Sequence, residues 1–161
     1  MSTNICILGV DPGAQTGIAI VTLRASLALS TCQLYELAAA DVIRGALVPL
    51  LAPVTAAVIE QFIIPSNARY RTSDAALALR VTGAAECDIV RANIPLTWQA
   101  AGQRYQVTLT QLSALGWRQP SLPHAEDALR HAVRWLAASY HTSAPKSAAV
   151  TELTHTLSHT P

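Results

Sequence analysis

Apolar residues alternate with small or polar ones through the first part of the chain, in a pattern that predicts three consecutive β-strands. The expected strands cover Asn4–Val10, Gly17–Arg24 and a stretch within Ser26–Leu37. Pro12 and Gly13 favour a tight turn between the first two strands. Because the connections are short, we expect the three strands to form an antiparallel meander.

Helical and strand patterns then follow one another along the rest of the chain. We expect a helix from Asp41 to Leu51, a buried central strand at Thr55–Gln61 and a polar loop from Pro65 to Ser73. A helix capped by Ser73 or Asp74 and a short strand at Cys87–Ala92 should follow. The remaining elements are a helix from Pro95 to Tyr105, a segment at Val107–Trp117 that could be strand or helix, and a helix from His124 to Tyr140. This order predicts a mixed α/β layer fold. Residues 1–141 are expected to form one domain, and residues 142–161, rich in Ser, Thr and His, a flexible tail.

The composition is that of a globular domain with little charge. The chain has 161 residues, of which 51% are hydrophobic and 13% charged, and its formal net charge of +1 does not indicate a nucleic-acid partner. Ten of the eleven basic residues are arginines, which favours bidentate contacts with phosphate or carboxylate. Six of these arginines but only three acids lie between residues 61 and 120, so this part could present a weakly basic surface.

The cysteines and the apolar runs predict a soluble, intracellular protein. The three cysteines are not spaced as metal ligands and resemble small buried hydrophobes of a reducing compartment. The N-terminus has no basic region that would indicate a signal peptide. The longest apolar run, Ala46–Ile59, contains Pro49 and Pro53 and is shorter than the ~20 residues of a membrane span.

Asp11 ends the first apolar strand and is the first candidate for chemistry. Alternation places it on the strand face that carries Ile5, Ile7 and Gly9. A carboxylate in apolar surroundings is costly to desolvate unless it is paired, so a metal ion or a charged ligand is one interpretation. The alternative is a hairpin in which Asp11 only accepts hydrogen bonds within the turn.

Glu60 repeats this arrangement at the end of the predicted central strand. In open α/β sheets, ligands bind at the carboxyl ends of the strands. Two acids on neighbouring strand ends would repel each other, and a divalent cation between them would relieve the repulsion. The alternative is a solvent-facing acid at the entrance to a loop.

The last predicted helix carries a polar group of residues beside its apolar face. At about 100° per residue, His124, Asp127 and His131 fall within one arc of roughly 60°. Asp127 is a better candidate ligand than Glu126, which is predicted to lie on the outer arc, where it can pair with Arg130. His124 could be a ligand or make a local hydrogen bond at the helix N-terminus. His131 could be a third ligand from the helix, but we expect it to lie behind the ligands or to face solvent.

The segments LGVDPG, VIEQF and HAEDAL, in this order, resemble the RuvC family of Holliday-junction resolvases. The resemblance spans Ile5 to Ala138. It implies a ribonuclease H-like fold with a mixed central sheet, in which parallel strands join the meander and helices flank the sheet. It also implies a homodimer that cuts four-way DNA junctions symmetrically in recombination and repair, with a branch-migration helicase as a further partner.

The resemblance also implies two divalent cations per active site, Mg²⁺ or in substitution Mn²⁺. It assigns the catalytic and metal-ligand roles to Asp11, Glu60, His124 and Asp127. Many family members have Asp where His124 stands, so this site would be less negative. Independently of the resemblance, two-metal hydrolysis of a phosphodiester requires acids of this kind around the scissile phosphate.

The resemblance further indicates residues that would contact DNA. These are Gln61, Phe62, Arg69, Arg71 and Arg80. Phe62 would stack on bases of the opened junction, or else pack in the core. Two departures from the family are the near-neutral charge and the absence of lysine between Ala100 and Gln119, so DNA affinity would rest on the arginines. A viral or prophage-type member fits these departures.

Three other interpretations remain open. An actin-like or sugar-kinase fragment also begins with a strand, an Asp and a Gly-rich turn, but such proteins need a second Gly-rich phosphate loop, which this sequence lacks. A non-catalytic DNA-binding homologue would have little reason to keep its buried acids. A related nuclease acting on other branched or single-stranded DNA is the third.

Overall fold

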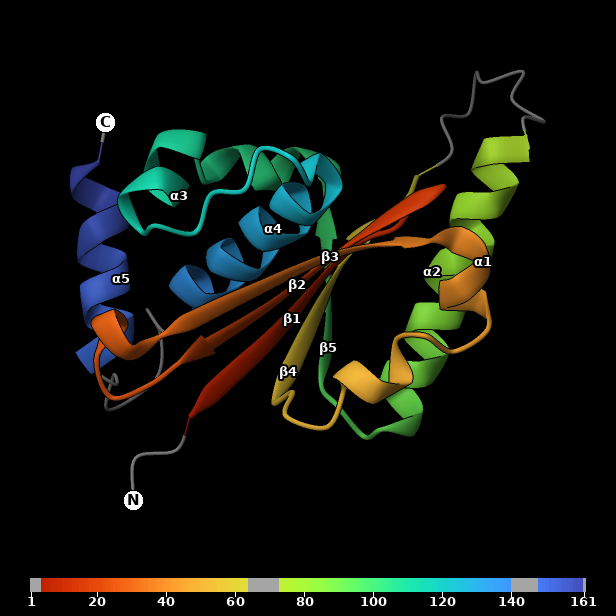
Figure 1. Cartoon of the computed structure of the whole chain (residues 1–161), viewed down its shortest axis with the longest axis horizontal. Helices are drawn as coiled ribbons and strands as arrows, with labels where there is room; N and C mark the ends of the chain where they lie inside the picture. Colours follow the sequence, from red (N-terminus) through yellow and green to blue (C-terminus); the bar gives the residue numbers. More distant parts are fainter. Residues whose placement is uncertain (1–3, 64–72, 140–147, 161) are drawn as a thin grey trace.

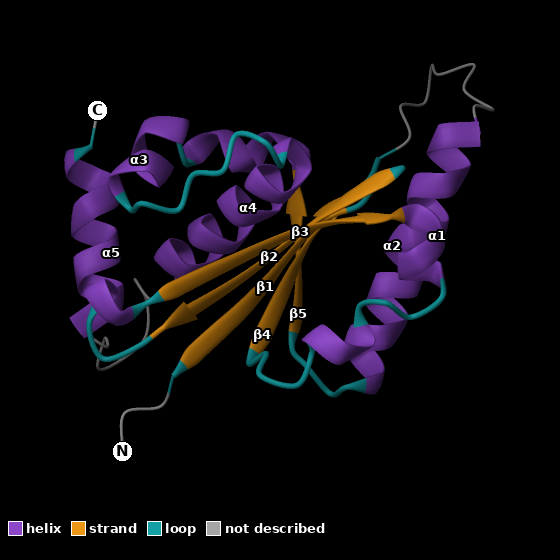
Figure 2. Cartoon of the chain, in the orientation of Figure 1, coloured by secondary structure: helices purple, strands orange, loops and turns teal. Residues whose placement is uncertain are grey.

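A five-stranded sheet with the order β3-β2-β1-β4-β5 forms the centre of the protein (Figures 1 and 2). The computed structural model describes residues 4–63, 73–139 and 148–160. The strands are β1 Ile5–Asp11, β2 Gln15–Leu23, β3 Thr31–Ala38, β4 Ala56–Gln61 and β5 Leu96–Ala100. β1, β2 and β3 pair antiparallel, whereas β4 pairs parallel with both β1 and β5. The predicted meander, the central strand and the mixed α/β class are therefore confirmed.

Helices cover both faces of this sheet (Figure 1). α1 (Ala39–Ile43) and α2 (Ser73–Arg91) pack on one face, and α4 (Pro123–Ser139) lies on the other, accompanied by α3 (Leu109–Ala114) and α5 (Ala148–His159). Short 3₁₀ turns occur at Leu27–Leu29, Val48–Leu50 and Ala101–Gln106. Among the described residues, none of the helices combines the length and the apolar character that crossing a membrane requires.

The alternation along β1 divides the core into two layers. Leu8 and Val10 are fully buried on the α1–α2 side, whereas Ile7 is fully buried against α4 with Leu129. Asp11 lies an even number of residues from Ile7, so it belongs to the face that α4 covers. This is the face that the sequence pattern predicts for it.

Two glycines allow α4 to lie directly on the sheet. A Cβ atom at Gly9 would collide with the backbone carbonyl of Ala128, and one at Gly17 would collide with that of His124. Gly17 is also the residue paired with Asp11 in the β1–β2 ladder. The missing side chains therefore bring the first turns of α4 against the strand ends where the acids lie.

Two helix boundaries differ from those that the sequence predicts. The strand expected at Cys87–Ala92 is wrong, because α2 continues to Arg91 and its Gly83 lies in open space. α1 begins after Ala38 rather than at Asp41, and it ends at Ile43, before Gly45 adopts a φ of 92°. A glycine with positive φ terminates a helix in this position.

The helix predicted from Pro95 to Tyr105 is also wrong. Residues Leu96–Ala100 form β5, the parallel partner of β4, and a 3₁₀ turn follows. The ambiguous segment after it contains α3, whose N-terminus has a capping box between Thr108 and Gln111. Pairing with β4, which no local pattern reveals, decides the structure of β5.

The C-terminal segment differs from the predicted flexible tail. Residues Ala148–His159 form α5, in which Ala149, Val150 and Leu153 are buried. The Glu152 carboxylate also accepts a hydrogen bond of 2.9 Å from the backbone N–H of Leu27. α5 is therefore part of the core layer that contains α4.

Candidate active site

Asp11 and Glu60 lie at the carboxyl ends of two neighbouring parallel strands, as the last residue of β1 and the residue before the last of β4. Val10 pairs with Ile59 in the β1–β4 ladder, so the next residue of each strand is one of the two acids. Their side chains are mostly buried, with 14% of Asp11 and 13% of Glu60 exposed. This arrangement confirms the prediction that the two acids occupy adjacent strand ends.

The N-terminal turn of α4 brings His124 to Asp11. The distance from His124 Nδ1 to Asp11 Oδ2 is 3.6 Å, and about half of the His124 side chain is exposed. The backbone N–H of His124 donates a hydrogen bond of 2.8 Å to the Glu36 carboxylate of β3, which satisfies one of the free donors at the helix start. The strand β3 thus anchors the turn that presents His124.

An arginine that the sequence reasoning missed connects two of the acids. Arg104 lies in the 3₁₀ turn after β5, and its Nη1 donates a hydrogen bond of 2.7 Å to Glu60 Oε2. Its Nε lies 3.3 Å from Asp127 Oδ2. The wrong helix prediction for residues 95–105 hid this residue, and nothing local marks it as a partner of acids that are distant in sequence.

Asp127 also pairs with Arg130, one turn further along α4. Arg130 Nη1 lies 3.2 Å from Asp127 Oδ1, while Arg130 Nε donates to the carbonyl of Val107 at 2.8 Å. The predicted pair between Glu126 and Arg130 is therefore wrong. Glu126 is buried, and it accepts a hydrogen bond of 2.7 Å from the backbone N–H of Gln119, in the loop that precedes α4.

His131 lies beneath Glu60 and has no exposed surface. Its Nε2 is 2.8 Å from Glu60 Oε2, and its Nδ1 is 2.8 Å from Gln99 Oε1. Gln99 is the residue of β5 that pairs with Glu60 in the ladder. Of the roles expected for His131, the structure excludes the one facing solvent and shows contact with Glu60, a candidate ligand.

Burial and neighbouring carboxylates raise the pKa of Asp11. Burial is the largest cause, and the neighbouring carboxylates of Glu60 and Asp127 add to it, so that the pKa of Asp11 is about 7 despite the opposing effects of His124 and Arg104. For Glu60, burial alone would raise the pKa, but the hydrogen bond from His131 and the charge of Arg104 hold it below its usual value. Of these two acids, Asp11 is therefore the one whose negative charge is less compensated.

The donor set fits a hard divalent cation in its chemistry. Carboxylate oxygens are the ligands that Mg²⁺ prefers. The raised pKa of Asp11 reflects its burial first and repulsion from Glu60 and Asp127 second, and a bound cation would offset both. No three acid, histidine or cysteine side chains in the described ranges converge closely enough to hold a metal ion as they stand. Instead, the cation that contacts both Glu60 and Asp127 is Arg104.

The predicted DNA contacts divide into three groups. Gln61 and Phe62 directly follow Glu60, the first exposed and the second half-buried. Arg80 is exposed on α2, which packs on the opposite face of the sheet from α4 (Figure 1). Arg69 and Arg71 lie outside the described residues.

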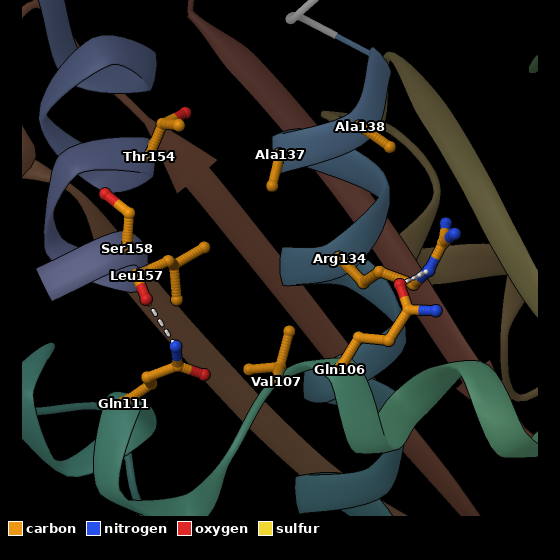
Figure 3. Close-up of a pocket in the computed structure, with 9 residues that line it drawn as sticks. All are labelled: Gln106, Val107, Gln111, Arg134, Ala137, Ala138, Thr154, Leu157 and Ser158. Atoms are coloured by element: carbon orange, nitrogen blue, oxygen red, sulfur yellow. Dashed lines mark hydrogen bonds between the residues drawn. The ribbon is translucent and has the colours of Figure 1, made fainter. Parts of the chain in front are cut away.

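A pocket of about 320 Å³ lies between α4 and α5 (Figure 3). Polar side chains cross its rim: Arg134 donates a hydrogen bond of 2.9 Å to Gln106, and the Gln111 amide donates to the carbonyl of Leu157. None of the candidate acids lines this pocket. Its hydrogen bonds join α3 and the 3₁₀ turn to α4 and α5, so they serve the scaffold.

Comparison with known proteins connects this architecture to solved structures. No family model and no curated protein matches the chain. Two structures of RuvC from Thermus thermophilus do match, each with 17% sequence identity over 85% of this chain. One is in complex with a Holliday junction substrate, with a TM-score of 0.60 over 94% of its chain, and the other has a TM-score of 0.61 over 95%. The mixed sheet and its flanking helices thus have the RuvC-like fold of the ribonuclease H-like class.

Proposed function

We propose that this protein is a metal-dependent endonuclease that hydrolyses phosphodiester bonds at four-way DNA junctions. The observation that carries the proposal is the arrangement of Asp11 and Glu60 on adjacent strand ends, with His124 and Asp127 presented by the helix above them. This set is carried by a RuvC-like fold, and one of the similar structures holds a Holliday junction substrate. The proposed context is DNA recombination and repair.

Each site residue has a role that follows from its surroundings. The carboxylates of Asp11, Glu60 and Asp127 would hold two divalent cations, normally Mg²⁺ with Mn²⁺ as a substitute. When bound, these cations supply the activation of water and the stabilisation of the leaving oxygen in phosphodiester hydrolysis. His124 lies beside Asp11 and is half exposed, so it can complete the ligand set or hold a proton during the reaction.

Part of the DNA recognition would come from the edge of the sheet that carries Glu60. Gln61 and Phe62 extend from the strand that carries Glu60, where an aromatic ring can stack on an unpaired base at a gain of about 1–3 kcal/mol. Arg69, Arg71 and Arg80 would contact phosphates. Symmetric incision of a junction requires two active sites, so we propose that the protein acts as a homodimer.

Cleavage of a synthetic four-way junction with mapped cut sites tests this function. In Mg²⁺ we expect paired, symmetric cuts, with a linear duplex of the same sequence left intact. Asp11→Asn should abolish cleavage but retain junction binding in a gel-shift assay, and wild-type rates in this variant would refute the site assignment. Equal cutting of linear or single-stranded DNA would indicate a general nuclease instead.

Two further measurements test the remaining parts of the proposal. If His124 belongs to the site, His124→Ala should lose activity, and His124→Asp should retain activity if the role is metal ligation. Full activity of both variants would remove His124 from the site. Light scattering tests the homodimer, because a stable monomer at working concentrations would contradict paired incision.

A further inference from the structure

Arg104 is the cation at the centre of the candidate site. Its guanidinium contacts Glu60 at 2.7 Å and Asp127 at 3.3 Å, and only 19% of its side chain is exposed. The carboxylates raise the pKa of Arg104, although burial by itself lowers it. Arg104 thus makes the contacts with two acids that a metal ion would make with their oxygens.

Arg104 lies close to Asp127 but does not form a hydrogen bond with it. The Nε atom of Arg104 is buried and, among the described residues, has no hydrogen-bond partner, even though Asp127 Oδ2 lies 3.3 Å away. Charge attraction therefore holds this pair without a well-aligned hydrogen bond. An arginine suited to Asp127 would use its planar fork for bidentate contact, which this geometry lacks.

Arg104 also has partners that do not depend on the acids. Its Nη1 donates to the Ala101 carbonyl at 3.3 Å, its Nη2 donates to the Tyr105 hydroxyl at 3.2 Å, and its Cζ lies 4.9 Å from the centre of the Tyr105 ring. These groups belong to the same 3₁₀ turn. A guanidinium that leaves the carboxylates would keep local hydrogen bonds and a cation–π contact, which lowers the cost of moving it.

Glu60 has a second donor that would stay in place. His131 Nε2 binds the same Oε2 atom that Arg104 contacts, and His131 is fully buried on α4. Departure of Arg104 would therefore leave Glu60 oriented by His131. Of the two donors to Glu60, only Arg104, the more exposed one, has to move.

We propose that Arg104 is an internal counter-ion that holds Glu60 and Asp127 together until a divalent cation displaces its guanidinium. This inference rests on the proposed metal-dependent function and adds to it a competition between the Arg104 guanidinium and the divalent cation for the same carboxylates. Competing occupants of one set of acids weaken each other reciprocally. Arg104 should therefore stabilise the metal-free protein and reduce its affinity for the cation.

Calorimetric titration with Mn²⁺ tests the competition. We expect Arg104→Met to bind Mn²⁺ at least about tenfold more tightly than the wild type, a difference of about 1.4 kcal/mol. Arg104→Lys should lie between the two, because an ammonium keeps the charge but cannot span both acids. The control is Arg44→Met, which removes the same charge from an exposed pair with Asp41 and should leave the affinity unchanged.

Thermal unfolding gives a second readout on the same variants. Arg104→Met should melt at a lower temperature than the wild type in EDTA, because its acids lose their counter-ion. Saturating Mn²⁺ should raise its melting temperature by more than it raises that of the wild type. Equal Mn²⁺ affinities and equal metal-induced shifts in the two proteins would overturn the competition while leaving the nuclease function standing.

A measurement on the wild type decides the question even if Arg104→Met does not fold. The arginine Nε–H resonance that disappears in Arg104→Lys should shift or broaden as Mg²⁺ is added, in step with binding. A resonance unchanged at saturation would overturn the proposal. If neither protein binds Mn²⁺ or Mg²⁺, the metal-dependent function itself fails, which is a result distinct from the two above.

Discussion

Glu60 accepts a hydrogen bond of 2.8 Å from His131, a side chain with no exposed surface. The other nitrogen of the imidazole contacts Gln99, so His131 links the adjacent strands β4 and β5 from within α4. Both partner atoms, Glu60 Oε2 and Gln99 Oε1, are oxygens that can accept a hydrogen bond from a ring N–H. His131 thus acts as a positioning residue for Glu60.

Replacing His131 by Leu should lower the free energy of unfolding by about 2–4 kcal/mol, because it removes the buried partner of Gln99 Oε1 and one of the two donors to Glu60 Oε2. Urea unfolding measures the loss. His131→Gln keeps an N–H donor and should recover part of both the stability and the Mn²⁺ affinity. If His131→Leu and His131→Gln have the same stability and the same Mn²⁺ affinity, the hydrogen bond to Glu60 has no positioning role.

Asp11 should make the metal-free protein less stable as pH rises. An unfolded Asp ionises near pH 4, whereas the pKa of Asp11 in the folded protein is about 7. Between these values the native state binds the extra proton, so stability falls with increasing pH through this window. Asp11→Asn removes the effect and should be more stable than the wild type by about 1–3 kcal/mol at pH 8 in EDTA.

The measurement for Asp11 is the free energy of unfolding of Asp11→Asn minus that of the wild type, along a pH series. This difference should be small near pH 4, grow up to pH 7 and then level off. A constant difference over the whole series would contradict the raised pKa of Asp11.

Gly17→Ala should be strongly destabilising, because the added methyl group meets the His124 backbone carbonyl at the start of α4. Overpacking of this kind costs about 1–3 kcal/mol or more. Gly83→Ala is the matched control, since nothing lies near its added methyl group and alanine favours a helix by up to about 1 kcal/mol. Denaturant unfolding should therefore give opposite signs for these two glycines.

Leu153→Ala should lower the free energy of unfolding by about 2–5 kcal/mol, because this side chain of α5 is completely buried in the core. Thr151→Ala, on the exposed side of the same helix, should change the stability by less than about 0.5 kcal/mol. Thermal unfolding of the two variants compares them directly. Equal stabilities would mean that α5 contributes little to the core.

The sequence predicts the parts of the fold that leave a local pattern. Alternation marks the meander and the face of Asp11, and the apolar segment before Glu60 marks the central strand. The positions of His124 and Asp127 follow from the helical period of α4. Strands, acids and the helix above them are thus accessible to sequence reasoning.

The parts that sequence reasoning misses depend on tertiary contacts. β5 is five residues long and owes its structure to pairing with β4 rather than to its own pattern. Arg104 becomes a site residue only because that pairing sets the position of the 3₁₀ turn after β5. Likewise, the buried face of α5 is short and follows a segment rich in polar residues.

The parallel pairing of β1 with β4 has a consequence for how the protein folds. The meander joins strands that are adjacent in sequence, so it can form early through local contacts. β4 must close a much longer loop to reach β1, and this closure also brings Asp11 and Glu60 together. The step with the larger loop-closure entropy is therefore also the step that meets charge repulsion. We expect the edge that carries these two acids to assemble late in folding, and dissolved Mg²⁺ to accelerate its formation.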